Sequence, residues 1–150
     1  MTERVDFYVL NSTAPKDRRT LACRVAEKAY LKNLSVIILG ASAEEAKALD
    51  DLLWTFSDRS FIPHRYLEGD DGEAATEPVR LTAALKDAGR ADLLVNLSDR
   101  MPADLAPYAR IAEIIDADPE RRRLGRERFK SYREHKLVLE THQLDDAAYP

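Results

Sequence analysis

The amino-acid sequence predicts an α/β protein in which helices flank a mostly parallel β-sheet. Short apolar segments rich in β-branched residues alternate along the chain with longer segments of helical periodicity, which is typical of this class. The 150 residues are enough for one domain with a sizeable core, and no internal repeat or low-complexity stretch divides them. We therefore expect a single domain over residues 1–150.

The first three elements follow from local patterns. Residues 5–10 (VDFYVL) form a short apolar and aromatic run, which predicts a strand. Residues 16–32 are expected to form a helix because apolar side chains recur on one face: Leu21, Ala22, Val25, Ala26 and Ala29. Residues 35–39 (SVIIL) are apolar almost throughout, as expected for a strand buried on both faces.

A second helix is predicted from Ser42 to about Trp54, because Ser42 and Glu45 form a capping box. Short strands are expected at 65–67 and, at a sheet edge, at 79–81. Between them, the acidic segment 68–77 holds two glycines and no large apolar residue, which predicts a mobile loop.

Two further strands and a long helix complete the chain. The apolar runs at 92–97 and 110–115 predict buried strands. Asp118 at the N-cap and Pro119 at the first helical position then begin a helix that extends to about Leu137. We expect residues 138–150 to form a frayed tail.

The last helix concentrates positive charge in an acidic protein. From Pro119 to Lys136 it carries eight Lys and Arg and three Glu, a net charge of +5, whereas the whole chain carries −4 and the rest of it therefore −9. Such a field suits an acidic peptide, a phosphate backbone or an acidic patch on a partner. A solvated helix face is an equally good interpretation.

Helical periodicity places five residues of this helix along one face: Arg122, Arg126, Phe129, Lys130 and Arg133. A different stripe holds Leu124 and Tyr132, which we assign to the core, with Arg128 at its margin. Gly125 costs about 1 kcal/mol in a helix interior relative to Ala, so it either permits close approach of a neighbour or is simply tolerated.

A second group of interest is apolar and aromatic. It lies at the end of the second helix and in the segment that follows, and consists of Trp54, Phe56, Phe61, Ile62 and Pro63. The segment either folds over the edge of the core or presents an aromatic patch to a protein partner, where Trp is enriched.

Several chemistries have no motif in this sequence. There is no glycine-rich dinucleotide or phosphate-binding motif and no nucleophile elbow. Among the histidines, His64 has Glu68 four residues later, but one histidine with one carboxylate is a weak site, so we expect no metal site and no cofactor. Cys23 is the only cysteine, which excludes an intrachain disulfide and, with no signal peptide or membrane-length apolar run, favours the cytoplasm.

Two segments, LLWTFSDRSFIPH (52–64) and LGRERFKSYR (124–133), together with the strands at 5–10 and 92–98, resemble the chi subunit of the bacterial DNA polymerase III holoenzyme. The resemblance covers nearly the whole chain in order. It implies a Rossmann-like fold without a nucleotide site, and a non-catalytic adaptor of the clamp-loader complex.

The resemblance also implies two binding surfaces. The first would hold the acidic C-terminal tail of single-stranded DNA-binding protein, which ends in phenylalanine, and carried over by position it comprises Arg122, Arg126, Phe129, Lys130 and Arg133. The family's aromatic at position 129 is usually tyrosine. The second would bind the psi subunit or an equivalent clamp-loader or helicase-like partner, and comprises Trp54, Phe61, Ile62, Pro63 and His64.

Two alternatives remain open from the sequence. The Arg-rich helix could bind nucleic acid directly, although the −9 carried elsewhere argues against this because phosphate binders usually spread positive charge over a face. The other alternative is a small enzyme whose pocket no sequence motif reveals.

Overall fold

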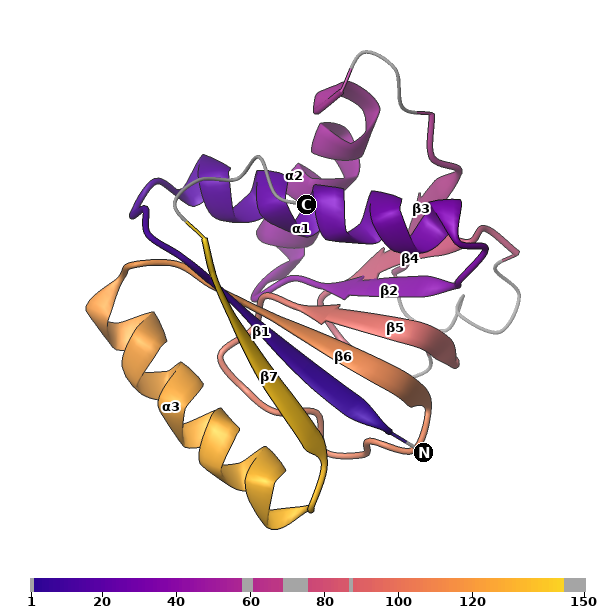
Figure 1. Ribbon diagram of the computed structural model, residues 1–150. Coiled ribbons are helices and arrows are strands. Elements are labelled where there is room, and N and C mark those ends of the chain that lie inside the picture. Colours follow the sequence, from indigo (N-terminus) through magenta and orange to yellow (C-terminus); the bar gives the residue numbers. More distant parts are fainter. Residues whose placement is uncertain (1, 58–60, 69–75, 87, 145–150) are drawn as a thin grey trace.

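The computed structural model describes residues 2–57, 61–68, 76–86 and 88–144. Over these residues the chain forms a seven-stranded sheet with three helices, and every strand pairing is parallel (Figure 1). The strand order is β3-β4-β2-β5-β6-β1-β7. The predicted α/β fold with a mostly parallel sheet is confirmed.

The apolar runs of the sequence form the strands. Their bounds are β1 (Arg4–Leu10), β2 (Val36–Leu39), β3 (His64–Tyr66), β4 (Val79–Thr82), β5 (Ala91–Asn96), β6 (Tyr108–Ile115) and β7 (Val138–Leu144). All four residues of β2 are buried, as expected of a strand covered on both faces.

The helices are α1 (Pro15–Leu31), α2 (Ala43–Thr55) and α3 (Pro119–Glu134). The predicted caps are confirmed for the last two: the Ser42 hydroxyl accepts a hydrogen bond from the Glu45 amide at 3.1 Å, and the Asp118 carboxylate accepts one from the Arg121 amide at 2.9 Å.

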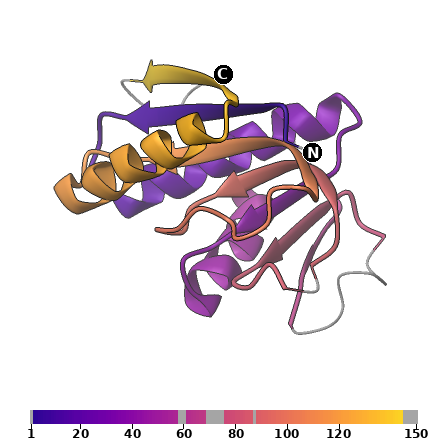
Figure 2. The same ribbon diagram turned by 90° about the horizontal axis from the view of Figure 1, so that it is seen from below.

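The helices divide between the two faces of the sheet (Figures 1 and 2). Leu21 and Ala26 of α1 pack with Leu49 and Leu53 of α2 in one apolar cluster. Tyr132 of α3 belongs to a second cluster on the opposite face. Alternate residues of β1 belong to the two clusters: Leu10 to the first, and Val5 and Phe7 to the second.

The structure differs from the sequence-based expectation at two strands. Residues 138–144, expected within a frayed tail, form β7 and pair along the whole of β1. Most residues of β7 are exposed, and the sequence of this strand does not contain the apolar run that marks the buried strands. β4 was expected at an edge, yet it lies between β2 and β3 and is buried along its length.

Some expectations lie wholly or partly outside the described residues. The predicted mobile loop at 68–77 is described only at Glu68, Thr76 and Glu77, and the end of the tail, 145–150, is not described.

Cys23 is buried, and burial raises the pKa of its thiol to about 12, as expected for a packed and unreactive side chain. None of the described helices is long and apolar enough to span a membrane.

Candidate binding site along the last helix

The start of α3 is held to the sheet by a buried carboxylate. Asp116 follows β6 and accepts hydrogen bonds from Arg121 Nε at 2.8 Å and Nη2 at 2.7 Å. Burial opposes ionisation of Asp116, but these bonds and one from the Asp118 amide hold the pKa of its carboxyl below the usual range. The Asp116–Arg121 pair therefore anchors the first turn of α3.

A second buried carboxylate, Glu113 of β6, fixes the middle of α3. It accepts hydrogen bonds from Arg128 Nε at 3.0 Å, from the Tyr132 hydroxyl at 2.6 Å and from Asn96 Nδ2 at 2.9 Å. Arg128 was expected at the margin of the core with its head in water, and this expectation is wrong: it is buried because Glu113 supplies a buried counter-charge. Sequence reasoning missed Glu113, which lies within the apolar run of β6.

The cations of α3 fall into two groups. Arg121, Arg123 and Arg128 form ion pairs with carboxylates of β6, the following turn or α3 itself. Four others have no carboxylate within salt-bridge distance in the part of the chain that the structure describes: Arg122, Arg126, Lys130 and Arg133. These four are the cations that the sequence placed on one face of the helix.

A pocket of about 290 Å³ lies between α3 and the sheet. Arg122, Gly125, Arg126 and Phe129 form its helix side, and the sheet side is built from alternate residues of three strands, Phe7, Val9, Ile115, Thr141 and Gln143. A Cβ atom at position 125 would overlap the Ile115 side chain, so Gly125 permits the close approach of α3 to β6 here. The pocket has an apolar floor and a cationic rim.

The pocket includes three of the five residues expected to bind the tail. Arg122 is half-buried and donates to the Asp116 carbonyl oxygen at 3.1 Å, whereas Arg126 is exposed. Phe129 is half-buried and packs on Phe7 with 5.2 Å between ring centroids. Arg133 and Lys130 lie outside the pocket lining. The Arg133 guanidinium lies over the Phe129 ring, 5.6 Å from its centroid, and Lys130 is exposed.

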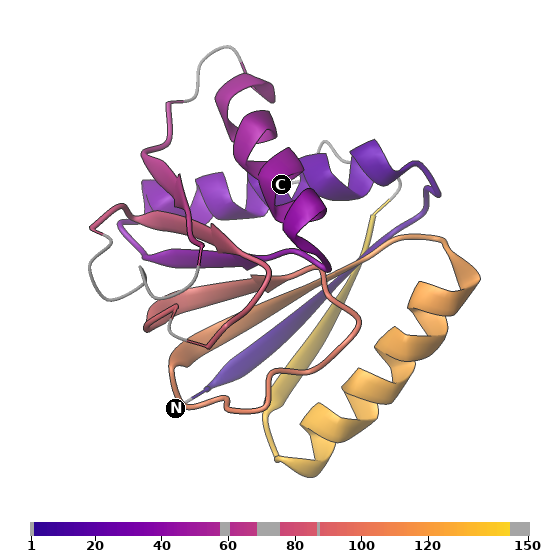
Figure 3. The same cartoon turned by 180° about the vertical axis from the view of Figure 1, so that it is seen from behind.

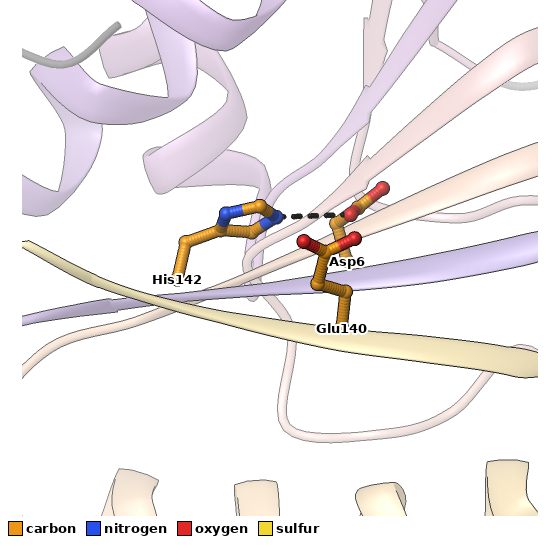
Figure 4. A group of neighbouring side chains, drawn as sticks. All are labelled: Asp6, Glu140 and His142. Atoms are coloured by element: carbon orange, nitrogen blue, oxygen red, sulfur yellow. Dashed lines mark hydrogen bonds and ion pairs between the residues drawn. The ribbon is translucent and has the colours of Figure 1, made fainter.

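On the other face of the sheet, charged side chains fasten β7 to β1 (Figure 4). Asp6 accepts hydrogen bonds from His142 Nε2 at 3.0 Å and from Arg4 Nη2 at 2.8 Å, and Arg4 also contacts Glu140. Burial opposes ionisation of Asp6, but these donors keep the pKa of its carboxyl below the usual range.

The ligand-type atoms of Asp6, Glu140 and His142 lie within 4.8 Å of one another, a spacing that could hold a metal ion. Sequence reasoning missed this group because it expected no strand after residue 137. Arg4 already forms ion pairs with both carboxylates, so their charge is balanced without a metal ion. We therefore assign the group to holding β7 in place.

The aromatic group at the end of α2 is partly a surface and partly core. Trp54 and Phe61 are 51% and 70% exposed, with ring centroids 5.6 Å apart. Ile62 is buried and packs in the core, so its expected role as a partner contact does not fit its position. The His64 ring is also buried. Its Nδ1 lies 2.6 Å from the Ile62 carbonyl oxygen and its Nε2 lies 3.0 Å from the Asp50 carbonyl oxygen. The ring packs against Trp54 with 4.3 Å between the ring centroids. Pro63 is half-buried.

The two candidate surfaces lie far apart. Trp54 lies in the last turn of α2, which packs on β3 and β4 at one edge of the sheet, whereas the pocket adjoins β7 at the other edge (Figure 3). The fold thus separates the cationic pocket from the aromatic patch by the full width of the sheet.

Comparison with solved structures identifies the fold alone. The chain is similar to the crystal structure of T4 UvsW with a TM-score of 0.65 and 11% sequence identity, over 95% of this chain and 42% of that chain. The chain therefore spans less than half the length of this structural relative.

Comparison with protein families and curated proteins is more specific. Residues 1–140 match the family described as DNA polymerase III chi subunit, HolC. DNA polymerase III subunit chi of Pseudomonas aeruginosa is 38% identical over 141 residues, which cover 94% of this chain and 96% of that protein. The protein of the same name from Escherichia coli is 27% identical over 132 residues, 85% of this chain and 88% of that protein. The chain belongs to the family of the DNA polymerase III chi subunit.

Proposed function

We propose that this protein is a non-catalytic, cytoplasmic adaptor of the replication machinery that binds the acidic C-terminal tail of single-stranded DNA-binding protein along α3. One observation carries the proposal. Two of the four α3 cations that lack a carboxylate partner among the described residues, Arg122 and Arg126, line a pocket with apolar walls. An acidic peptide would supply the missing carboxylates.

The pocket offers each chemical group that such a peptide needs. Arginine can hydrogen-bond both oxygens of a carboxylate, so Arg126 at the rim is suited to an acidic side chain or a terminal carboxylate. The half-buried ring of Phe129 offers an apolar wall to a terminal aromatic side chain. No hydroxyl is available at position 129, so the ring acts through its apolar surface.

The aromatic patch is the proposed site for a second partner, the psi subunit or an equivalent protein that connects the adaptor to the clamp loader. Trp54 and Phe61 expose large apolar rings side by side, and such rings are common energetic centres of interfaces. The buried His64 ring packs against the Trp54 ring. Because the patch lies at the opposite sheet edge from the pocket, both partners could bind at once.

The proposal is tested by calorimetric titration of the protein with a synthetic peptide of the same organism's single-stranded DNA-binding protein C-terminus. A peptide without the terminal phenylalanine and a short single-stranded DNA are titrated in parallel. We expect micromolar binding of the full peptide, loss of binding with the shortened one, and no binding of DNA. Binding of DNA alone would instead make α3 a phosphate-binding helix and contradict the adaptor function.

A further inference from the structure

The pocket adjoins an edge of the sheet that is open in the described part of the chain. β7 pairs with β1 on one side, and no described strand pairs with its other side. α3 and β7 lie next to each other, joined by a tight turn at Lys136, which has a φ of 59° (Figure 1). An exposed strand edge is a template for pairing with another extended chain.

The register shows which residues of β7 face that open edge. Leu10 is the partner of Leu144, and the Asn11 amide donates to the Leu144 carbonyl oxygen at 2.8 Å. In a parallel pair the N–H and C=O of one residue point to the same neighbour, and alternate residues point to opposite sides. The main-chain N–H and C=O groups of Leu139, Thr141 and Gln143 therefore point to the open edge of β7.

The same residues turn their side chains toward α3. Thr141 and Gln143 line the pocket together with Arg126, and Leu139 packs against the apolar cluster that contains Phe129. A strand added to β7 would therefore place alternate side chains toward Arg126. An acidic peptide is complementary to this side, and it favours an extended form because its charges repel one another.

We infer that the acidic tail binds as an additional strand on β7, with main-chain hydrogen bonds to Leu139, Thr141 and Gln143 and its carboxylates toward α3. This inference rests on the proposed tail binding and specifies its mode. Main-chain pairing would supply affinity that does not depend on the peptide's sequence, while the pocket reads the terminal side chain and the charge.

The test uses wild-type protein and tail peptides that each carry one backbone N-methyl group upstream of the terminal residue. A methyl group on an amide that donates to β7 removes one main-chain hydrogen bond, which we expect to weaken binding about three- to tenfold. Methylation of the alternate amides, which point away from β7, should leave affinity unchanged. These peptides are matched controls because they carry the same modification.

The outcomes separate this inference from the proposal on which it rests. If the unmodified peptide binds but methylation has no alternating effect, strand addition is overturned while tail binding stands. If the unmodified peptide does not bind, both are overturned.

Amide hydrogen exchange gives an independent reading. On saturation with the unmodified peptide, exchange at the amides of Leu139, Thr141 and Gln143 should slow at least about tenfold, because they gain hydrogen bonds. The amides of Glu140 and His142, which face β1, should change little. Unchanged exchange at the three outward amides would contradict the inference.

Discussion

The Tyr132 hydroxyl donates a 2.6 Å hydrogen bond to the carboxylate of Glu113, which is buried beneath α3. The same carboxylate accepts from Arg128, so a single residue of β6 holds two successive turns of the helix. The bonds of Arg128 and Tyr132 to Glu113 therefore help to fix how α3 presents Phe129, whose ring packs on Phe7 beside the Tyr132 ring. Stability of the helix and the geometry of the pocket are coupled through Glu113.

Tyr132→Phe keeps the ring and removes the hydroxyl, and we expect it to lower the free energy of unfolding by about 1 kcal/mol. Glu113→Ala leaves the Arg128 guanidinium buried without its carboxylate, and the expected loss is about 3–5 kcal/mol. Urea unfolding of each variant measures the loss of unfolding free energy. Arg123→Ala, at an exposed ion pair of the same helix, is the control and should change stability by less than about 1 kcal/mol. A Tyr132→Phe protein as stable as wild type would show that the bond contributes nothing.

Asp116 predicts how stability depends on pH. Its folded-state pKa is lowered, so the unfolded state binds a proton more readily and the group stabilises the fold above its unfolded pKa of about 3.9. This contribution is lost as pH falls from that value through the lower folded pKa. Asp116→Asn should therefore flatten the loss of stability over this acidic range, as followed by urea unfolding at a series of pH values. If the unfolding free energy of the variant fell with pH as steeply as that of wild type, other carboxylates would account for the acid sensitivity.

Gly125→Ala tests the close packing of α3 on β6. Alanine favours the helix by about 1 kcal/mol, but its Cβ overlaps the Ile115 side chain, whose terminal methyl can turn into the pocket. We expect the net change in stability to stay within about 1 kcal/mol, while tail affinity falls because the pocket is narrower. Ile115→Val added to Gly125→Ala removes the displaced methyl group and should restore binding. If the double variant binds no better than Gly125→Ala, the loss does not arise from the pocket.

The aromatic patch is tested by a double variant, Trp54→Ala with Phe61→Ala. It should abolish binding of the second partner and leave tail affinity within about twofold of wild type, because the two surfaces lie at opposite sheet edges. Leu31→Ala, which removes an exposed apolar side chain elsewhere, should affect neither. Loss of both activities in a variant that is still folded would refute separate surfaces.

How far the sequence predicts this molecule depends on which signal each part carries. Apolar runs such as 35–39 and the caps at Ser42 and Asp118 are local, so the elements they predict are found. β7 has no apolar run because it is an exposed edge strand, and its pairing with β1 depends on contacts between residues far apart in sequence. A local pattern could not reveal them.

The same distinction applies to the site. Helical spacing alone predicted the face of α3 that carries the cations without a carboxylate partner among the described residues. It did not predict that Thr141 and Gln143 complete the pocket, because these come from β7. Nor could it show that Ile62 is buried while the adjacent Phe61 is exposed, since both read as apolar residues of one loop.

The most direct test of tail binding along α3 compares three variants by calorimetric titration with the tail peptide. Arg126→Ala and Arg123→Ala each remove one positive charge from α3. Of these two arginines, Arg126 lines the pocket and has no carboxylate partner among the described residues, whereas Arg123 forms ion pairs with Glu120 and Glu127. We expect Arg126→Ala and Phe129→Ala each to weaken binding by at least about 1 kcal/mol, or about fivefold, and Arg123→Ala to bind like wild type. Wild-type affinity should also fall as salt rises, because the rim is exposed. Equal affinity of all three variants and wild type, or equal weakening by both arginine variants, would contradict the site.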